Sequence, residues 1–105
     1  MNIDLLKAIQ VINKKLVELS DDIGMDLKII EDAIIEKEYY WVFFYNSKLY
    51  LDNGNLSYAL AGNSPFIVDK IQGKIYETGT AYDIKFYMEE FEKNEIPVLL
   101  GSASN

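Results

Sequence analysis

Few stretches of the chain combine residue types that could do chemistry, and the most distinctive is "GNSP" at residues 62–65. It turns sharply between the apolar segments "SYALA" and "FIVDK". A catalytic interpretation needs a base to activate Ser64, and the bases on offer are lysines such as Lys48 or Lys70. The stretch also lacks the spacing and the lysine of a phosphate-binding loop. The residues therefore favour a structural turn over a catalytic loop.

Two acidic patterns are the other candidates. "DNGN" at residues 52–55 resembles the start of a calcium loop, but Gly54 stands third and Asn63 stands twelfth, where an EF-hand requires a carboxylate. Glu89 and Glu90 are adjacent on an expected helix, so they point in different directions and share no acid–base site. Neither pattern predicts a catalytic residue or a metal ligand set.

Missing residue types narrow the function further. The sequence contains no Cys, no His and no Arg, and its ten basic residues are all Lys. Zinc, copper and haem sites thereby lose their usual ligands. Serine triads and histidine acid–base chemistry are excluded for the same reason. An enzyme that uses carboxylates alone remains possible, but the sequence singles out no catalytic carboxylate, so we expect a protein that is not an enzyme and that needs no cofactor.

Charge and hydropathy indicate the kind of partner. The formal net charge of −7 argues against nucleic acid, which needs a basic surface. An acidic surface would suit a basic protein partner, although it also serves solubility alone. No apolar run reaches the ~20 residues of a membrane span, and the N-terminus lacks the pattern of a signal peptide. We expect a cytoplasmic protein without membrane contact.

Apolar residues at helical spacing predict a helix at each end of the chain. Asn2 is the expected N-cap of the first helix, and Gly24 is expected to follow its end. The second helix follows a capping-box pattern at residues 80–83 and ends near Asn94 and Pro97. The apolar stripes are Leu5, Ile9, Ile12, Leu16 and Leu19 in the first helix, and Ile84, Tyr87, Met88 and Phe91 in the second.

Between the helices the residues favour strands. The segment 26–45 is rich in β-branched and aromatic residues and predicts one interrupted strand followed by a second. Alternation places Trp41 on one face of the sheet and Val42 on the other. Such a strand is either covered on both sides or has one exposed, adhesive side. The members of the two faces are Trp41, Phe43 and Tyr45 against Val42 and Phe44.

A hairpin follows, and the elements together define a fold class. Segments 66–68 and 74–76 flank "DKIQG", in which Gly73 can take a positive φ. The predicted fold is α+β, a small antiparallel sheet of about four strands with an N-terminal and a C-terminal helix packed on it (α-β-β-β-β-α). Residues 1–95 are expected to form a single domain, and residues 96–105 a mobile tail.

Residues 48–64 form an unusually long connection for a compact domain. Its apolar residues can fold down onto the sheet, and "LSYALAG" predicts a helical turn ended by Gly62. Asn63 is expected to bond backbone groups, and Pro65 to begin the next strand. The apolar residues are Tyr50, Leu51, Leu56, Tyr58 and Leu60.

Residues 41–91 resemble the immunity protein 35 family, also called the YrhB-like domain. The matching pattern is the aromatic strand "WVFFYNS", then "GNLSYALAGNSPFIVD", a hairpin, "GTA" and a terminal helix. The resemblance implies a protein that gives immunity in bacterial polymorphic toxin systems. Several of the family's recurring residues have backbone roles in turns, which favours structural roles for them. The recurring features fall on Trp41, Tyr45, Ser47, Gly54, Ala61, Gly62, Asn63, Pro65, Gly73, Gly79 and Thr80.

The resemblance leads to a functional hypothesis, a non-catalytic protein that neutralises a cognate, basic toxin domain. Two alternatives remain open, a chaperone-like protein using the Trp41 strand and a small-ligand protein using the 48–64 loop. A monomer or a weak homodimer is expected. The candidate contact residues for the toxin are Tyr50, Asp52, Tyr58, Glu89 and Glu92.

Overall fold

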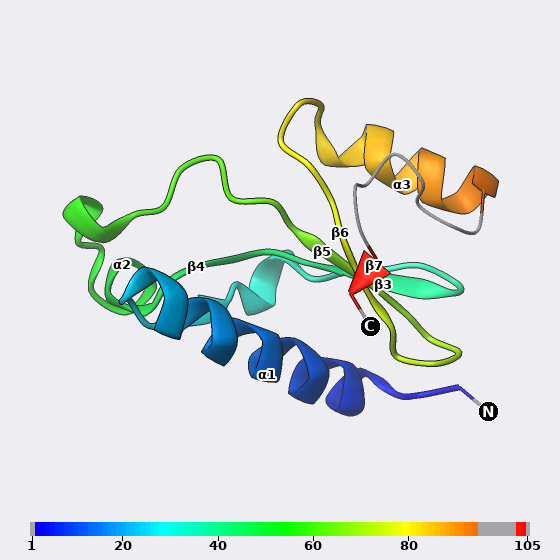
Figure 1. Cartoon of the computed structure of the whole chain (residues 1–105), viewed down its shortest axis with the longest axis horizontal. Coiled ribbons are helices and arrows are strands. Elements are labelled where there is room, and N and C mark those ends of the chain that lie inside the picture. The colour runs from blue at the N-terminus through cyan, green and yellow to red at the C-terminus, as the bar shows by residue number, and fades with distance from the viewer. Residues whose placement is uncertain (1, 95–102, 105) are drawn as a thin grey trace.

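Three α-helices and two antiparallel sheets make up the part of the chain that the structure, a computed structural model, describes: residues 2–94 and 103–104 (Figure 1). The predicted α+β class is confirmed. The elements in chain order are α1 (Leu5–Ile23), β1 (Leu27–Ile29), the 3-10 turn η1 (Glu31–Ala33), β2 (Ile35–Glu36), β3 (Tyr40–Phe43), β4 (Tyr45–Ser47), α2 (Lys48–Asn53), the 3-10 turn η2 (Leu56–Tyr58), β5 (Phe66–Asp69), β6 (Ile75–Glu77), α3 (Ile84–Asn94) and β7 (Ala103–Ser104).

The strands form two sheets, whereas the sequence predicted one sheet of about four strands. The larger sheet has the order β2-β3-β5-β6-β7, and the smaller sheet pairs β1 with β4. The predicted aromatic strand is split at Phe44, after which β4 leaves the large sheet and pairs with β1. Within the large sheet Trp41 lies opposite Val68, and Phe43 opposite Phe66.

Both faces of β3 are covered, which decides between the two interpretations of this strand. Trp41 and Phe43 pack in one core cluster with the buried stripe of α1. Val42 packs in a second cluster with Tyr87 and Phe91 of α3. Figure 1 shows α1 and α3 on opposite sides of the large sheet. Because a buried large side chain contributes about 1.5–3 kcal/mol, the alternating pattern of β3 ties both helices to the sheet.

The N-terminal ends of the helices differ from the predicted ones. Asp4, not Asn2, caps α1, and its Oδ1 accepts a hydrogen bond from the Lys7 N–H at 2.9 Å. Asn2 is too early because Ile3 N–H donates to the Lys70 carbonyl at 2.6 Å, which keeps this end extended against the hairpin. Helix α3 begins at Ile84 rather than directly after Thr80.

The C-terminal stop of α1 and the start of α3 rest on single residues. Gly24 adopts φ 71° and donates its N–H to the Ser20 carbonyl, as predicted. Asp83 Oδ1 accepts from the Phe86 N–H at 3.2 Å, so Asp83 caps α3; its predicted role at a first-turn donor is confirmed, whereas Thr80 as the cap is wrong. The apolar stripe of α3 faces the core as predicted, with Tyr87 and Phe91 buried and Ile84 and Met88 partly buried, and α3 ends at Asn94.

The segment 48–64 is more ordered than a long loop. Its first part is α2, capped by Ser47 Oγ, which accepts from the Tyr50 N–H at 3.1 Å, and ended by Gly54 at φ 68°. The predicted helical turn is shorter than expected, because η2 ends at Tyr58. Gly62 therefore lies in a bend, with φ 75°, and does not terminate the turn.

The expected tail at residues 96–105 and Pro97 lie largely outside the described residues. Its described part is β7, which pairs antiparallel with β6.

Candidate functional site

The five predicted contact residues lie at two separate places. Tyr50 and Asp52 belong to α2 and Tyr58 to η2, whereas Glu89 and Glu92 belong to α3. Figure 1 places the α2–η2 segment and α3 at opposite ends of the molecule. The structure therefore does not unite them in one surface.

Charge on α2 is already compensated by lysines. The carboxylate of Asp52 contacts Lys48 Nζ at 2.5 Å and Lys28 Nζ at 2.9 Å. The hydrogen bonds from Lys48 and then Lys28 hold the pKa of Asp52 below its ordinary value. What α2–η2 offers to a partner is mainly apolar surface, since Tyr58 is 41% and Leu56 77% exposed.

The corner at residues 62–65 is held by hydrogen bonds between distant segments. Asn63 Nδ2 donates to the Tyr45 carbonyl at 2.7 Å. The Pro65 carbonyl accepts from both the N–H and the Oγ1 of Thr78, at 3.1 and 2.6 Å. The predicted backbone role of Asn63 is confirmed. The candidate bases Lys48 and Lys70 each hold an ion pair, so neither offers a free amine to Ser64.

Several residues of the family pattern serve the packing of the core or the shape of a turn. Trp41 is 2% exposed and lies under Lys70 Nζ, 4.9 Å from the ring centroid. Tyr45 stacks on Phe66 with the ring centroids 5.4 Å apart. The hairpin residue Gly73 has φ 72°, as predicted. These positions explain the fold and leave little exposed surface on the Trp41 strand.

A small hollow of about 290 Å³ lies between the corner that precedes β5 and the start of α3. Gly79 lies so close to Tyr87 that an added Cβ would be 2.5 Å from the Tyr87 hydroxyl oxygen. The described lining of the hollow is Phe44, Gly62, Asn63, Pro65, Gly79, Thr80, Tyr82, Ile84 and Tyr87. This hollow is apolar apart from a few side chains, and none of its described lining residues is charged.

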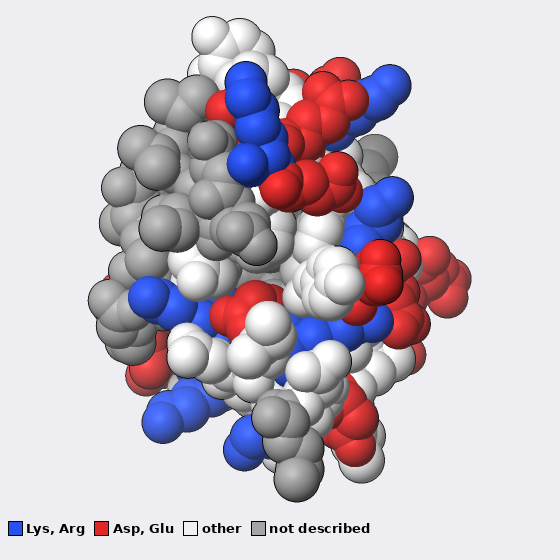
Figure 2. All heavy atoms as spheres, turned by 90° about the vertical axis from the view of Figure 1, so that its right-hand side faces the viewer, with Lys and Arg blue, Asp and Glu red and all other residues white. Residues whose placement is uncertain are grey.

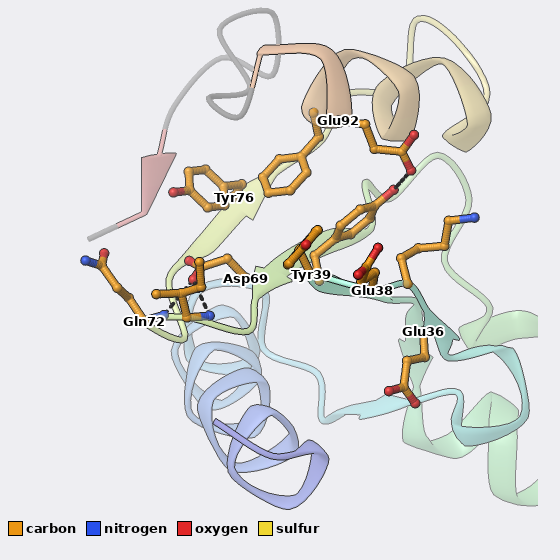
Figure 3. A pocket seen from close by; sticks show the side chains of 11 residues that line it. Glu36, Glu38, Tyr39, Asp69, Gln72, Tyr76 and Glu92 are labelled. Atoms are coloured by element: carbon orange, nitrogen blue, oxygen red, sulfur yellow. Dashed lines mark hydrogen bonds between the residues drawn. The ribbon is translucent and has the colours of Figure 1, made fainter. Parts of the chain in front are cut away.

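A much larger pocket, with a volume of about 1020 Å³, opens where the β2–β3 turn, the β5–β6 hairpin and α3 meet (Figure 3). Aromatic rings form its floor: the Tyr40 and Phe91 centroids are 4.8 Å apart, and those of Tyr76 and Phe91 are 5.4 Å apart. We call it the acidic pocket. Its described lining is Glu36, Lys37, Glu38, Tyr39, Tyr40, Asp69, Ile71, Gln72, Tyr76, Phe91 and Glu92.

Carboxylates outnumber amines in the lining of the acidic pocket, four to one. Figure 2 looks onto this end of the molecule and shows acidic side chains along its upper and right-hand edges. Glu36 is paired with Lys70 at 2.7 Å, and this lysine lowers the pKa of Glu36. Asp69 accepts backbone N–H bonds from Ile71, Gln72 and Lys74 of its own turn. These two carboxylates therefore already have partners within the fold.

The other two carboxylates differ in how they are held. Tyr40 donates its hydroxyl hydrogen to Glu92 Oε2 at 2.5 Å, joining β3 to α3. Burial, and then the neighbouring Glu92, raise the pKa of the Tyr40 hydroxyl, which therefore keeps its proton. Within the described ranges neither Glu38 nor Glu92 has a cationic partner.

Sequence reasoning found one member of this pocket, Glu92, and missed the others. Glu89 is exposed on α3 but does not line the pocket. The available signal was "EKEYY" at residues 36–40, where acidic residues and tyrosines directly precede the buried strand. That signal did not indicate which other elements would meet there.

Among residues 2–94 and 103–104 there is no group of three or more acidic, His or Cys side chains arranged to hold a metal ion. In the same part of the chain no helix has the length and apolar content to cross a membrane.

Comparisons with known proteins agree with the resemblance seen in the sequence. The family model described as Immunity protein 35 matches residues 7–93. A relative from Escherichia coli (strain K12), named "Uncharacterized protein YrhB", is 38% identical over 52 residues, which cover 50% of this chain and 55% of the relative. The match thus spans about half the length of that curated relative. No solved structure matches the chain.

Proposed function

Because the chain belongs to the immunity protein 35 family, we propose that it binds and neutralises a cognate bacterial toxin domain and catalyses no reaction itself. The observation that carries the proposal is the family match, which extends from within α1 to the last turn of α3. We expect this protein to act in the cytoplasm, where the toxin would harm the cell that produces the toxin.

Electrostatics supports a basic toxin as the partner. The net charge of −7 would accelerate association with a positively charged domain, because opposite fields steer the encounter. A stable complex buries about 800 Å² on each partner, so one end of this small molecule would supply most of the contact. We assign the main contact to the end with Glu92 and Glu89, and a secondary role to Tyr50, Asp52 and Tyr58.

Co-expression with the toxin domain encoded beside the gene tests the proposal. Cells that produce both proteins are expected to grow, and the two proteins are expected to co-purify as a complex at micromolar concentration or below. Continued toxicity, with this protein soluble and folded, would contradict the proposal. A catalytically dead toxin domain allows the binding measurement to be made independently of growth.

The chaperone-like alternative depended on an exposed aromatic strand. Trp41 and Phe43 are buried, at 2% and 0% exposure, so this strand offers no adhesive side. The toxin-binding function therefore has the better support.

A further inference from the structure

We infer that the acidic pocket binds an arginine-bearing segment of the basic partner. This inference rests on the proposed function, because it names the chemistry by which the toxin domain would be recognised. The segment is expected to place a guanidinium between Glu38 and Glu92, over the tyrosine surface of the pocket.

Uncompensated charge is the first argument. Two of the four carboxylates are already engaged, Glu36 by Lys70 and Asp69 by the N–H groups of its turn. Glu38 and Glu92 remain, and they reach the pocket from different elements, the β2–β3 turn and α3 (Figure 3). Lys37 is the single amine in the described lining, so the pocket retains an excess of negative charge that a cationic side chain would neutralise.

Fixed acceptor geometry is the second argument. The Tyr40 hydroxyl holds Glu92 Oε2, which leaves the other carboxylate oxygen, Oε1, as an acceptor. A carboxylate that is already oriented loses little conformational entropy when a ligand binds.

Aromatic surface is the third argument, and it favours arginine over lysine. Tyr39 is 60% exposed at the edge of the pocket, and no described ring packs against it. A planar guanidinium can stack on a tyrosine while donating to carboxylates, which the compact ammonium of lysine does less well. The volume of about 1020 Å³ exceeds that of one side chain, so the neighbouring residues of a segment would also fit.

A peptide titration tests the pocket without the toxin. The probe is an acetylated and amidated Gly-Arg-Gly-Arg-Gly peptide, and its twin carries citrulline, an uncharged analogue of nearly the same shape, at both arginine positions. We expect the arginine peptide to shift amide NMR signals at residues 36–40, 69–72 and 92, and the citrulline peptide to bind roughly tenfold more weakly. Equal binding of the two peptides, or shifts clustered elsewhere, would overturn the inference.

Charge-removing variants add a matched comparison. Glu38→Gln with Glu92→Gln removes both charges, while the glutamine at 92 can still accept from Tyr40. The double variant is expected to bind the arginine peptide roughly tenfold more weakly, with its melting temperature nearly unchanged. Glu18→Gln with Asp22→Asn also removes two charges, from the exposed side of α1, and binding is expected to stay at the wild-type level. Similar losses in both variants would indicate nonspecific attraction and overturn the inference.

The toxin domain separates this inference from the proposed function. If the wild-type protein protects cells and the double variant binds the toxin as tightly as wild type, the pocket inference fails and the proposed function stands. If the wild-type protein gives no protection but binds the arginine peptide through Glu38 and Glu92, the proposed function fails and the pocket remains a cationic-ligand site.

Discussion

Tyr40 and Glu92 are 52 residues apart in the chain, and a hydrogen bond of 2.5 Å joins the hydroxyl of one to the carboxylate of the other. Tyr40 begins strand β3 of the large sheet, and Glu92 lies in the last turn of α3. The bond therefore connects the sheet to its covering helix at the edge of the acidic pocket. It couples the stability of the fold to the shape of the candidate site.

Replacing Tyr40 by Phe is expected to lower the free energy of unfolding by about 1 kcal/mol, because the hydrogen bond from the Tyr40 hydroxyl to Glu92 is removed. The pKa of Tyr40 is raised in the folded protein, so its contribution is complete at neutral pH and is lost as the pH rises above about 10. Urea unfolding measured at neutral and at alkaline pH should show a smaller alkaline loss in Tyr40→Phe. Tyr40→Phe is still expected to lose some stability at alkaline pH, since Tyr45 and Tyr76 also have raised pKa values. If Tyr40→Phe lost as much stability at alkaline pH as the wild-type protein, the pKa of the Tyr40 hydroxyl would be the same in the folded and unfolded states, and the prediction would be wrong.

Gly79→Ala is expected to destabilise the protein by about 1–3 kcal/mol, because its Cβ would collide with the Tyr87 hydroxyl 2.5 Å away. Tyr87 is 4% exposed and cannot easily move. Thermal unfolding measures the loss, and adding Tyr87→Phe, which removes the colliding oxygen, should recover part of it. If the double variant were no more stable than Gly79→Ala alone, the collision would not be the cause.

Asp69→Ala is expected to loosen the β5–β6 hairpin, because three backbone N–H groups lose their acceptor. The expected cost is about 1–2 kcal/mol. Hydrogen exchange should show faster exchange at Ile71, Gln72 and Lys74, with protection of α1 largely kept. Asp69→Asn is the milder comparison, since its amide retains one oxygen.

The pKa of the Asp52 carboxyl, measured by NMR, is expected to lie below the ordinary aspartate value. Lys48→Met should raise it more than Lys28→Met does, because the hydrogen bond from Lys48 is the larger cause. Because this pKa is lowered in the fold, the associated stability is present above the unfolded-state value and is lost as the pH falls through the folded-state value. An Asp52 pKa insensitive to both lysines would show that these ion pairs do not persist in solution.

The two ends of the molecule can be compared directly for binding to the toxin. We expect Tyr58→Ala to weaken the complex by less than about tenfold, and Glu92→Gln to weaken it by more, because the main contact is assigned to the pocket end. Calorimetric titration with the inactive toxin domain measures both. A larger loss at Tyr58 would move the interface to the α2–η2 segment.

Much of the secondary structure follows from local patterns. The stripes of α1 and α3, the two faces of β3 and the positive φ of Gly73 depend on periodicity and on single residue types, so they could be predicted. Leu5 is the exception in the α1 stripe, because it is exposed at the first position of the helix. The start of α3 after Asp83 was not predicted, because Thr80 and Asp83 are both capable caps and local sequence does not choose between them. Helix α2 was missed for a similar reason, since its six residues carry only a weak periodic signal.

Periodicity along the chain established which residues turn inward and that helices cover a sheet, because those properties depend on near neighbours. Only the tertiary structure decided that the sheet divides after Phe43 and that Glu38, Asp69 and Glu92 meet around one pocket. Each of these three acidic residues looks like an ordinary surface residue in its own segment. Their meeting depends on how β3 pairs with β5 and how α3 lies across the sheet. Such packing minimises exposed apolar area over the whole chain and leaves no mark in any short stretch of it.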